Sequence, residues 1–166
     1  MTATVRAAFG LGSNLGDRHA FLANAIAALR STPEVTVVGV SPLVESDPVG
    51  GPAQPDFLNA VVVVDTTLAP EALLELAQRC ESEAGRERSE RWGPRTLDVD
   101  VLAYGELTTD DPVLTLPHPR AVERAFVLIP WAAVDPHFVV AGRSVADWAA
   151  EVDASGVRPA DQVREC

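Results

Sequence analysis

The chain has 166 residues, of which 47% are hydrophobic, and its formal net charge is −11. This length suits one domain with one substantial core, and the apolar fraction is too high for a disordered protein. The longest apolar runs, such as residues 60–64, are too short to span a bilayer, and residues 1–6 lack the apolar segment of a secretory signal. We therefore expect a single cytoplasmic domain over residues 1–166, without membrane contact and with a frayed polar tail after about Asp153.

Positive charge is concentrated in one short part of the chain. All 13 basic residues are arginines, and five of them lie between Arg79 and Arg95. A nucleic-acid-binding protein usually carries a broad basic surface, because phosphate contacts supply most of its affinity. An acidic chain with one basic segment better suits a small anionic ligand, so we expect no nucleic acid partner. The alternative is that these arginines are solvated side chains at a helix end and in a loop.

The first half of the chain is predicted to alternate strands and helices. Residues 5–11 are short and apolar, which predicts a strand, and Asp17 can cap a helix that ends near Arg30. Valine-rich segments at 35–44 and 57–66 predict two further strands. The segment between them, residues 47–55, contains three prolines and two adjacent glycines and predicts a loop. A second helix is expected to begin at Pro70 and to end at Gly85.

The second half begins with residues 86–96, which show no periodicity and predict a loop, and continues with a strand over 97–104. Further short strands are expected at 114–116 and 138–140, and helices at 121–133, with a break near Pro130, and at 144–151. The order is strand, helix, strand, strand, helix, strand, followed by short elements. This order predicts an α+β fold of the ferredoxin-like split βαβ type, with helices packed on a central antiparallel sheet.

Two aspartates stand two positions apart in the strand expected over residues 97–104. Because side chains alternate along a strand, Asp98 and Asp100 project from one face, about 7 Å apart, while Val99 and Val101 face the core. Paired carboxylates on a rigid face suit Mg²⁺. The pattern alone also describes an exposed, solvated strand face. The apolar neighbours favour a central strand, where a cation would relieve the repulsion between the carboxylates.

An arginine-rich loop over residues 86–95 directly precedes this pair. Phosphoryl-type transfer depends on positioning and on neutralising oxygen charge, and a guanidinium can donate to two phosphate oxygens at once. The sequence therefore indicates a phosphate site made by arginines and a metal ion. Because the chain has no lysine, it cannot contain a Walker A motif. The glycines at 10, 12 and 16 are spaced one residue too widely for a dinucleotide fingerprint and predict a strand-to-helix turn.

Several further side chains fit either a structural or a binding role. Phe57 and Asn59 share one strand face beside the proline-rich loop. They are either core and backbone-bonding residues or a pair that stacks on a flat heterocycle and hydrogen-bonds to its edge. Phe126 is a core residue by default. His118 lies between two prolines and is either a surface residue or a donor to a phosphate oxygen.

Six motifs, taken in order, resemble the 6-hydroxymethyl-7,8-dihydropterin pyrophosphokinase family. They are Gly-Ser-Asn-Leu-Gly at 12–16, Phe-Leu-Asn-Ala at 57–60, Gly-Arg-Glu-Arg at 85–88, Arg-Trp-Gly-Pro-Arg-Thr-Leu-Asp-Val-Asp at 91–100, Leu-Pro-His-Pro at 116–119 and Arg-Ala-Phe-Val-Leu at 124–128. The resemblance runs from about Ala7 to Pro136, and its most specific block is 91–100. It implies a ferredoxin-like fold and transfer of the terminal diphosphate of ATP to a pterin alcohol in folate biosynthesis, with release of AMP.

The resemblance also implies roles for individual residues. Asp98 and Asp100 would bind two Mg²⁺ ions that bridge the ATP phosphates, and they would form the catalytic set together with Arg86 and Arg95. The ATP contacts would come from Gln78, Glu81, Arg88, Val101, Thr115, His118 and Arg124. The pterin would be held by Ser46, Pro48, Val49, Phe57, Asn59, Trp92 and Phe126, with the two phenylalanines on either side of its ring. We expect ATP and 6-hydroxymethyl-7,8-dihydropterin as the partners of a monomer, and we assign no general base.

Some features depart from the family, and two other classes of protein compete with it. Pro119 and Val113 replace residues found near the nucleotide in some members, and the chain after Pro136 matches too weakly to assign a role. A ferredoxin-like RNA-binding module would need exposed aromatics and a basic face, which the 5% aromatic content and the charge of −11 oppose. A catalytically silent nucleotide sensor on the same scaffold differs from the enzyme only in turnover.

Overall fold

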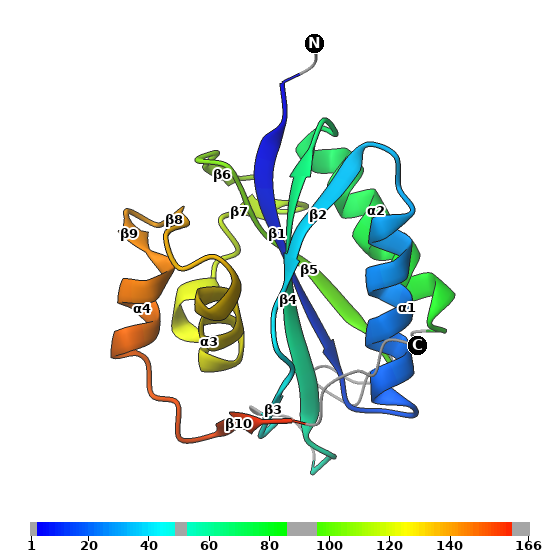
Figure 1. Ribbon diagram of the computed structural model, residues 1–166, viewed down its shortest axis with the longest axis vertical. Coiled ribbons are helices and arrows are strands. Elements are labelled where there is room, and N and C mark those ends of the chain that lie inside the picture. The colour runs from blue at the N-terminus through cyan, green and yellow to red at the C-terminus, as the bar shows by residue number, and fades with distance from the viewer. Residues whose placement is uncertain (1–2, 49–52, 86–95, 161–166) are drawn as a thin grey trace.

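A six-stranded antiparallel sheet forms the centre of the computed structural model, which describes residues 3–48, 53–85 and 96–160 (Figure 1). Its strands run in the order β10, β3, β4, β1, β5, and β2 also pairs with β4. Their bounds are β1 Val5–Ser13, β2 Val35–Val40, β3 Val44–Ser46, β4 Phe57–Thr66, β5 Asp98–Tyr104 and β10 Val157–Pro159. The four strands expected from residues 5–104 thus lie in the order fourth, first, third, second, which is the split βαβ arrangement. The predicted α+β class is confirmed.

The helices cover both faces of this sheet (Figure 1). α1 (Arg18–Arg30) and α2 (Pro70–Glu83) lie on one face, and α3 (Ala125–Val134) and α4 (Val145–Glu151) on the other, with a short 3₁₀ turn η1 (Ala121–Glu123) before α3. Two two-stranded ribbons complete the described elements, β6 (Thr109–Asp110) with β7 (Thr115–Leu116) and β8 (Val139–Val140) with β9 (Arg143–Ser144). In the part of the chain that the structure describes, no helix is long and apolar enough to cross a membrane.

β4 is buried on both faces, which explains its continuous apolar run. Val62 and Val64 belong to the core cluster beneath α1 and α2, whereas Val61 and Val63 belong to the cluster beneath α3. All four side chains have no solvent exposure. A strand covered on both sides has no polar face, so it shows a run of valines in place of alternation. This strand and β1 form the rigid centre on which the cavity described below is built.

The predicted helix ends are confirmed by their capping contacts. The Oδ1 atom of Asp17 accepts a hydrogen bond from the Ala20 amide at 3.1 Å and so satisfies one of the unpaired amides at the start of α1. Gly85 follows α2 with a φ of 70°, a conformation that a side chain would disfavour. Ser144 caps α4 by accepting from the Asp147 amide at 3.1 Å.

Three expectations about the elements are wrong. The single strand expected over 35–44 is two strands, β2 and β3, which follow each other along the same edge of β4 and are interrupted at residues 41–43, where Pro42 has no amide to donate. The helix expected over 121–133 is interrupted at Arg124, whose backbone is extended, and continues without a break through Pro130. The tail expected to fray after Asp153 instead adds β10 to the sheet beside β3.

Candidate active site

A cavity of about 370 Å³ opens on the face of the sheet that carries α3. Its lining comes from strands β1, β4 and β5 and from the segments that surround them. The strands supply Gly10, Leu11, Gly12, Phe57, Asn59, Ala60, Asp98, Asp100 and Leu102. The surrounding segments supply residues 46–48, 54, 120, 123–127, 153 and 155–157. The cavity therefore collects side chains from both halves of the chain over the middle of the sheet.

Two glycines of β1 form the floor of the cavity between its two functional ends. Gly12 pairs with Asp98 of β5 on one side and with Asn59 of β4 on the other, and Gly10 pairs with Asp100. A Cβ atom on Gly12 would lie 3.4 Å from the Asn59 Oδ1 atom and 3.7 Å from the Phe57 ring. The absence of side chains at Gly10 and Gly12 thus leaves room for a ligand to lie across the strand, from the Phe57 end to the aspartate end.

The aspartate pair projects as the strand pattern predicts. Asp98 and Asp100 both line the cavity, while Val99 and Val101 are 4% exposed and pack into the core beneath α2. Within the described ranges no group of three or more His, Cys, Asp or Glu side chains is arranged to hold a metal ion. A divalent cation bound by these two carboxylates would complete its coordination with water and substrate oxygens, which is the usual manner of Mg²⁺ at phosphate sites. The donor set therefore fits Mg²⁺.

His118 is fixed beside the aspartates by its own backbone. Its amide donates to the Leu102 carbonyl at 2.8 Å, and its Nε2 atom lies 4.0 Å from an Asp100 carboxylate oxygen. Burial lowers the pKa of His118, and the positive charges of Arg124 and Arg120 lower it further, against the opposing effect of Asp98. The neutral ring accepts from the Arg120 amide at Nδ1, 3.2 Å away, so its proton is on Nε2. That N–H is a hydrogen-bond donor on the aspartate side of the site.

The opposite end of the cavity is aromatic and amide-lined. Phe57 and Phe126 both contribute to the lining, and the Arg124 guanidinium lies 5.5 Å from the centre of the Phe126 ring. Asn59 is 3% exposed, and its Nδ2 atom donates to the Ser46 hydroxyl at 2.8 Å. Because the side-chain nitrogen of Asn59 is bound to β3 in this way, the Oδ1 atom of Asn59 points towards Gly12. A buried carbonyl oxygen in a cavity that two aromatic rings also line suits the hydrogen-bonded edge of a flat heterocycle.

Comparison with known proteins decides the family. The family model described as 7,8-dihydro-6-hydroxymethylpterin-pyrophosphokinase (HPPK) matches residues 8–136. This chain belongs to the HPPK family. Among its relatives, the 2-amino-4-hydroxy-6-hydroxymethyldihydropteridine pyrophosphokinase of Methylorubrum extorquens is 46% identical over 92% of this chain and 96% of that protein. The Bacillus subtilis protein of the same name is 45% identical over 89% of this chain and 86% of that one.

Solved structures show the same fold. Wild-type Plasmodium falciparum HPPK-DHPS superposes with a TM-score of 0.65 over 89% of this chain, at 12% sequence identity. This chain covers 44% of that longer protein. The P. falciparum structure with STZ-DHP gives a TM-score of 0.68 at 12% identity, covering 89% of this chain and 43% of the other. Because identity is this low, these structures support the HPPK fold and not individual contacts.

The structure brings together many, but not all, of the side chains expected for an HPPK site. Those that line the cavity are Ser46, Pro48, Phe57, Asn59, Asp98, Asp100, Arg124 and Phe126. Gln78 is exposed on α2, Val101 is buried in the core, and Thr115 donates its hydroxyl to the Asp111 carbonyl at 3.0 Å. None of these three lines the cavity. Val49, Arg86, Arg88, Trp92 and Arg95 lie outside the residues that the structure describes.

Two parts of the cavity lining were not expected from the sequence. One part is Arg120, just before η1, and Glu123, at the end of η1. The signal that could have indicated them is the Leu-Pro-His-Pro motif at 116–119, which they follow in the chain. Asp153, Ser155, Gly156 and Val157 contribute from the segment expected to fray. No local pattern marks that segment, because its place beside β3 depends on pairing with residues more than 100 positions away.

Glu81 holds the aspartate strand and does not line the cavity. Its Oε2 atom accepts a hydrogen bond at 2.9 Å from the amide of Val99, which lies between the two aspartates. Glu81 is 9% exposed, and its neighbours on α2 pack in the core. β5 is the edge strand of the described sheet and not the central strand that its apolar neighbours suggested, so within the residues that the structure describes no strand pairs with its outer amides. The Glu81 carboxylate is the acceptor for one of them, the Val99 amide, and so holds the part of β5 that carries Asp98 and Asp100.

Replacing Glu81 with leucine is expected to lower the free energy of unfolding by about 2 kcal/mol, because it leaves the buried Val99 amide without this acceptor. Glu81→Gln keeps a carbonyl oxygen and should lose less. Urea denaturation measures the stability, and hydrogen exchange at the Val99 amide should become faster in the leucine variant. Glu75→Leu, at an exposed position of α2, is the matched control. A Glu81→Leu protein as stable as the control would contradict this role.

Proposed function

We propose that this protein transfers the pyrophosphoryl group of MgATP to the hydroxymethyl oxygen of 6-hydroxymethyl-7,8-dihydropterin, giving AMP and the pterin diphosphate in folate biosynthesis. The observation that carries the proposal is a single cavity with a pair of aspartates at one end and an aromatic and amide pocket at the other, joined across the glycine floor of β1. Membership of the HPPK family and the names of relatives at 45–46% identity support the same reaction.

The aromatic end is proposed to bind the pterin. Phe57 and Phe126 stack on the two faces of its ring, and the Asn59 Oδ1 atom accepts a hydrogen bond from the amino edge of the ring. Stacking orients the ring, and the buried amide selects a heterocycle with donors at that edge. Ser46 and Pro48 complete this pocket from the β3 side. Val49 and Trp92 are proposed as further contacts on the basis of the family resemblance alone.

The aspartate end is proposed to bind the ATP phosphates. Mg²⁺ held by Asp98 and Asp100, as two ions with ATP present, would neutralise charge on the phosphate oxygens. Arg124 lines the cavity, and the Nε2–H group of His118 supplies a neutral donor beside Asp100. Arg86 and Arg95 are proposed to stabilise the transferring group, and Arg88 to contact ATP, from the family motif. The proposed ATP contacts of Gln78, Glu81, Val101 and Thr115 rest on the family resemblance, since none of these side chains lines the cavity.

The proposed reaction is a direct displacement at the β-phosphorus. The hydroxymethyl oxygen forms a bond to this atom while the bond from the β-phosphorus to the oxygen bridging to the α-phosphate breaks, and AMP leaves with the electron pair. The hydroxyl proton passes to solvent, and no side chain is assigned as its base. The protein lowers the barrier by aligning the two substrates across β1 and by providing positive charge and donors at the phosphates.

The location and assembly of the protein are also proposals. We propose that it works as a cytoplasmic monomer without a nucleic acid partner, in keeping with a net charge of −11 and a cavity sized for small ligands. Size-exclusion chromatography with light scattering tests the monomer, and a dimeric mass at micromolar concentration would contradict it.

The proposed reaction is tested by product analysis with ATP and Mg²⁺, in the presence and absence of 6-hydroxymethyl-7,8-dihydropterin. AMP is expected only when the pterin is present, in an amount equal to the pterin diphosphate, and excess EDTA should abolish both products. ADP in place of AMP would indicate ordinary kinase chemistry. ATP binding without any product would favour the silent nucleotide sensor.

A further inference from the structure

The C-terminal strand β10 forms part of the cavity wall, although it lies beyond the segment that matches the family model. Val157 pairs with Ser46 and Arg158 with Glu45 across the ladder between β10 and β3. The backbone of this segment is also held at both ends. The Asp47 amide donates to the Gly156 carbonyl at 3.0 Å, and the Ala160 amide donates to the Leu43 carbonyl at 3.2 Å. The strand is therefore anchored without help from its side chains.

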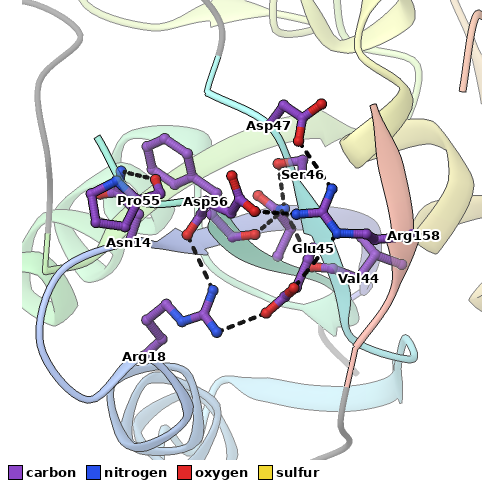
Figure 2. Close-up of polar contacts among 11 residues, drawn as sticks. Asn14, Arg18, Val44, Glu45, Ser46, Asp47, Pro55, Asp56 and Arg158 are labelled. Carbon is purple, nitrogen blue, oxygen red and sulfur yellow. Dashed lines mark hydrogen bonds and ion pairs between the residues drawn. The ribbon is translucent and has the colours of Figure 1, made fainter. Parts of the chain in front are cut away.

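The side chain of Arg158 reaches across three acidic residues from two neighbouring segments (Figure 2). Its Nη1 atom lies 3.0 Å from Asp47 Oδ1, its Nε atom 3.7 Å from Glu45 Oε2, and its Nη2 atom donates to the Asp56 carboxylate. Asp47 directly follows β3, and Asp56 directly precedes β4. Arg158 thus links the two ends of the connection between these strands.

Arg18 ties the same acidic group to the first turn of α1 (Figure 2). Its Nη2 atom lies 2.7 Å from Glu45 Oε1, and its Nη1 atom donates to the Asp56 carbonyl at 3.1 Å. Glu45 therefore lies between two guanidiniums. The two arginines and three carboxylates join four segments of the chain, namely α1, β3, the entry to β4 and β10. The network is partly exposed, so any one pair within it adds little to stability.

The residues next to this network in sequence belong to the aromatic end of the cavity. Ser46 and Pro48 flank Asp47, and Phe57 follows Asp56, and all three line the cavity. The hydrogen bond with Asp47 and the nearby carboxylate charges raise the pKa of Arg158, so its positive charge is retained at every pH at which the enzyme works. If this charge were absent, Asp47 and Asp56 would lose a shared partner and would repel each other.

We propose that Arg158 is a positioning residue that sets the spacing between the two walls of the pterin end of the cavity. Through Asp47 it holds the wall formed by Ser46 and Pro48, and through Asp56 it holds the start of β4, which carries Phe57 and Asn59. It touches neither substrate. The inference rests on the proposed function, because that proposal assigns this end of the cavity to the pterin. Its specific consequence is that loss of Arg158 affects the pterin much more than ATP.

The test compares the steady-state kinetics of Arg158→Met with those of Arg6→Met. Arg6 is the matched control, because its side chain is 42% exposed like that of Arg158 and bonds to two carboxylates, Asp65 and Asp135, away from the cavity. Arg158→Met is expected to raise the KM for the pterin about tenfold and the KM for ATP less than about twofold, because a small displacement of a binding wall is costly. Arg6→Met should change neither KM.

Two further measurements separate positioning from a general effect on folding. Arg158→Lys keeps the positive charge but not the forked guanidinium, so its pterin KM should lie between those of Arg158→Met and the unmodified protein. The Arg158→Met and Arg6→Met proteins should have melting temperatures within about 3 °C of each other. A fall in melting temperature specific to Arg158→Met, with equal changes in both KM values, would overturn the proposal, as would an unchanged pterin KM. If the unmodified protein formed no AMP with pterin in the same assay, the proposed reaction itself would fail.

Discussion

Replacing Asp98 or Asp100 with asparagine is expected to reduce kcat about a thousandfold while leaving the fold intact. Asparagine has nearly the same shape but no charge, so each variant removes half of the negative charge that is proposed to hold Mg²⁺ beside the ATP phosphates. A thousandfold loss corresponds to about 4 kcal/mol of transition-state stabilisation. Both side chains project into the cavity and not into the core, and removing one charge relieves their mutual repulsion. The free energy of unfolding should therefore be unchanged or slightly higher.

The matched control for this prediction is Asp65→Asn. The Asp65 side chain is 32% exposed, close to the 35% of Asp100, and it pairs with Arg6 at 2.7 Å outside the cavity. The Asp65→Asn substitution removes the same charge from a side chain of similar exposure. Because this side chain lies outside the cavity, kcat should stay within about twofold of that of the unmodified protein. Turnover close to normal in either Asp98→Asn or Asp100→Asn, at saturating Mg²⁺, would show that the metal assignment is wrong.

Replacing Phe126 with alanine is expected to raise the KM for the pterin about thirtyfold and to change the KM for ATP much less. Stacking of a flat base on an aromatic side chain contributes about 1–3 kcal/mol, and the middle of this range corresponds to about thirtyfold in affinity. Phe126 is only partly buried and lines the cavity, so its ring is available to a ligand. Phe57→Ala should act in the same direction, because its ring lines the same end.

Phe138→Leu separates a lost binding contact from a lost core contact. Phe138 packs against Trp131 with the ring centres 5.3 Å apart and belongs to the core beneath α3, but it does not line the cavity. This control should lower the melting temperature without changing the ratio of the two KM values. Equal losses of pterin and ATP affinity in Phe126→Ala would indicate a structural role, as in the control.

The parts of the fold that the sequence predicted are those with a strong local signal. β4 could be placed from its run of valines, α1 from Asp17 and its apolar spacing, and the direction of Asp98 and Asp100 from strand alternation alone. The two-residue period of a strand fixes which side chains share a face, whatever the rest of the chain does. This is why the aspartate pair and the Phe57–Asn59 pair both lie where they were expected.

The parts that could not be predicted depend on contacts distant in sequence. β10 has a polar, proline-containing sequence with no strand periodicity, and it becomes a strand because β3 offers it an unpaired edge. The hydrogen bond from the Val99 amide to Glu81 could not be predicted either, because it depends on helix α2 lying beside β5, the edge strand of the described sheet. Arg158 gave no local signal of a role beside the cavity, since its three acidic partners lie more than 100 positions earlier in the chain.

In the proposed reaction, the pterin alcohol attacks the β-phosphorus of ATP. The most direct test uses ATP radiolabelled at the β-phosphorus, with 6-hydroxymethyl-7,8-dihydropterin and Mg²⁺, followed by separation of the products. All transferred label is expected in the pterin diphosphate, and the AMP should carry none. Label retained in ADP, beside an unlabelled pterin monophosphate, would show attack at the γ-phosphorus and would contradict the proposed reaction.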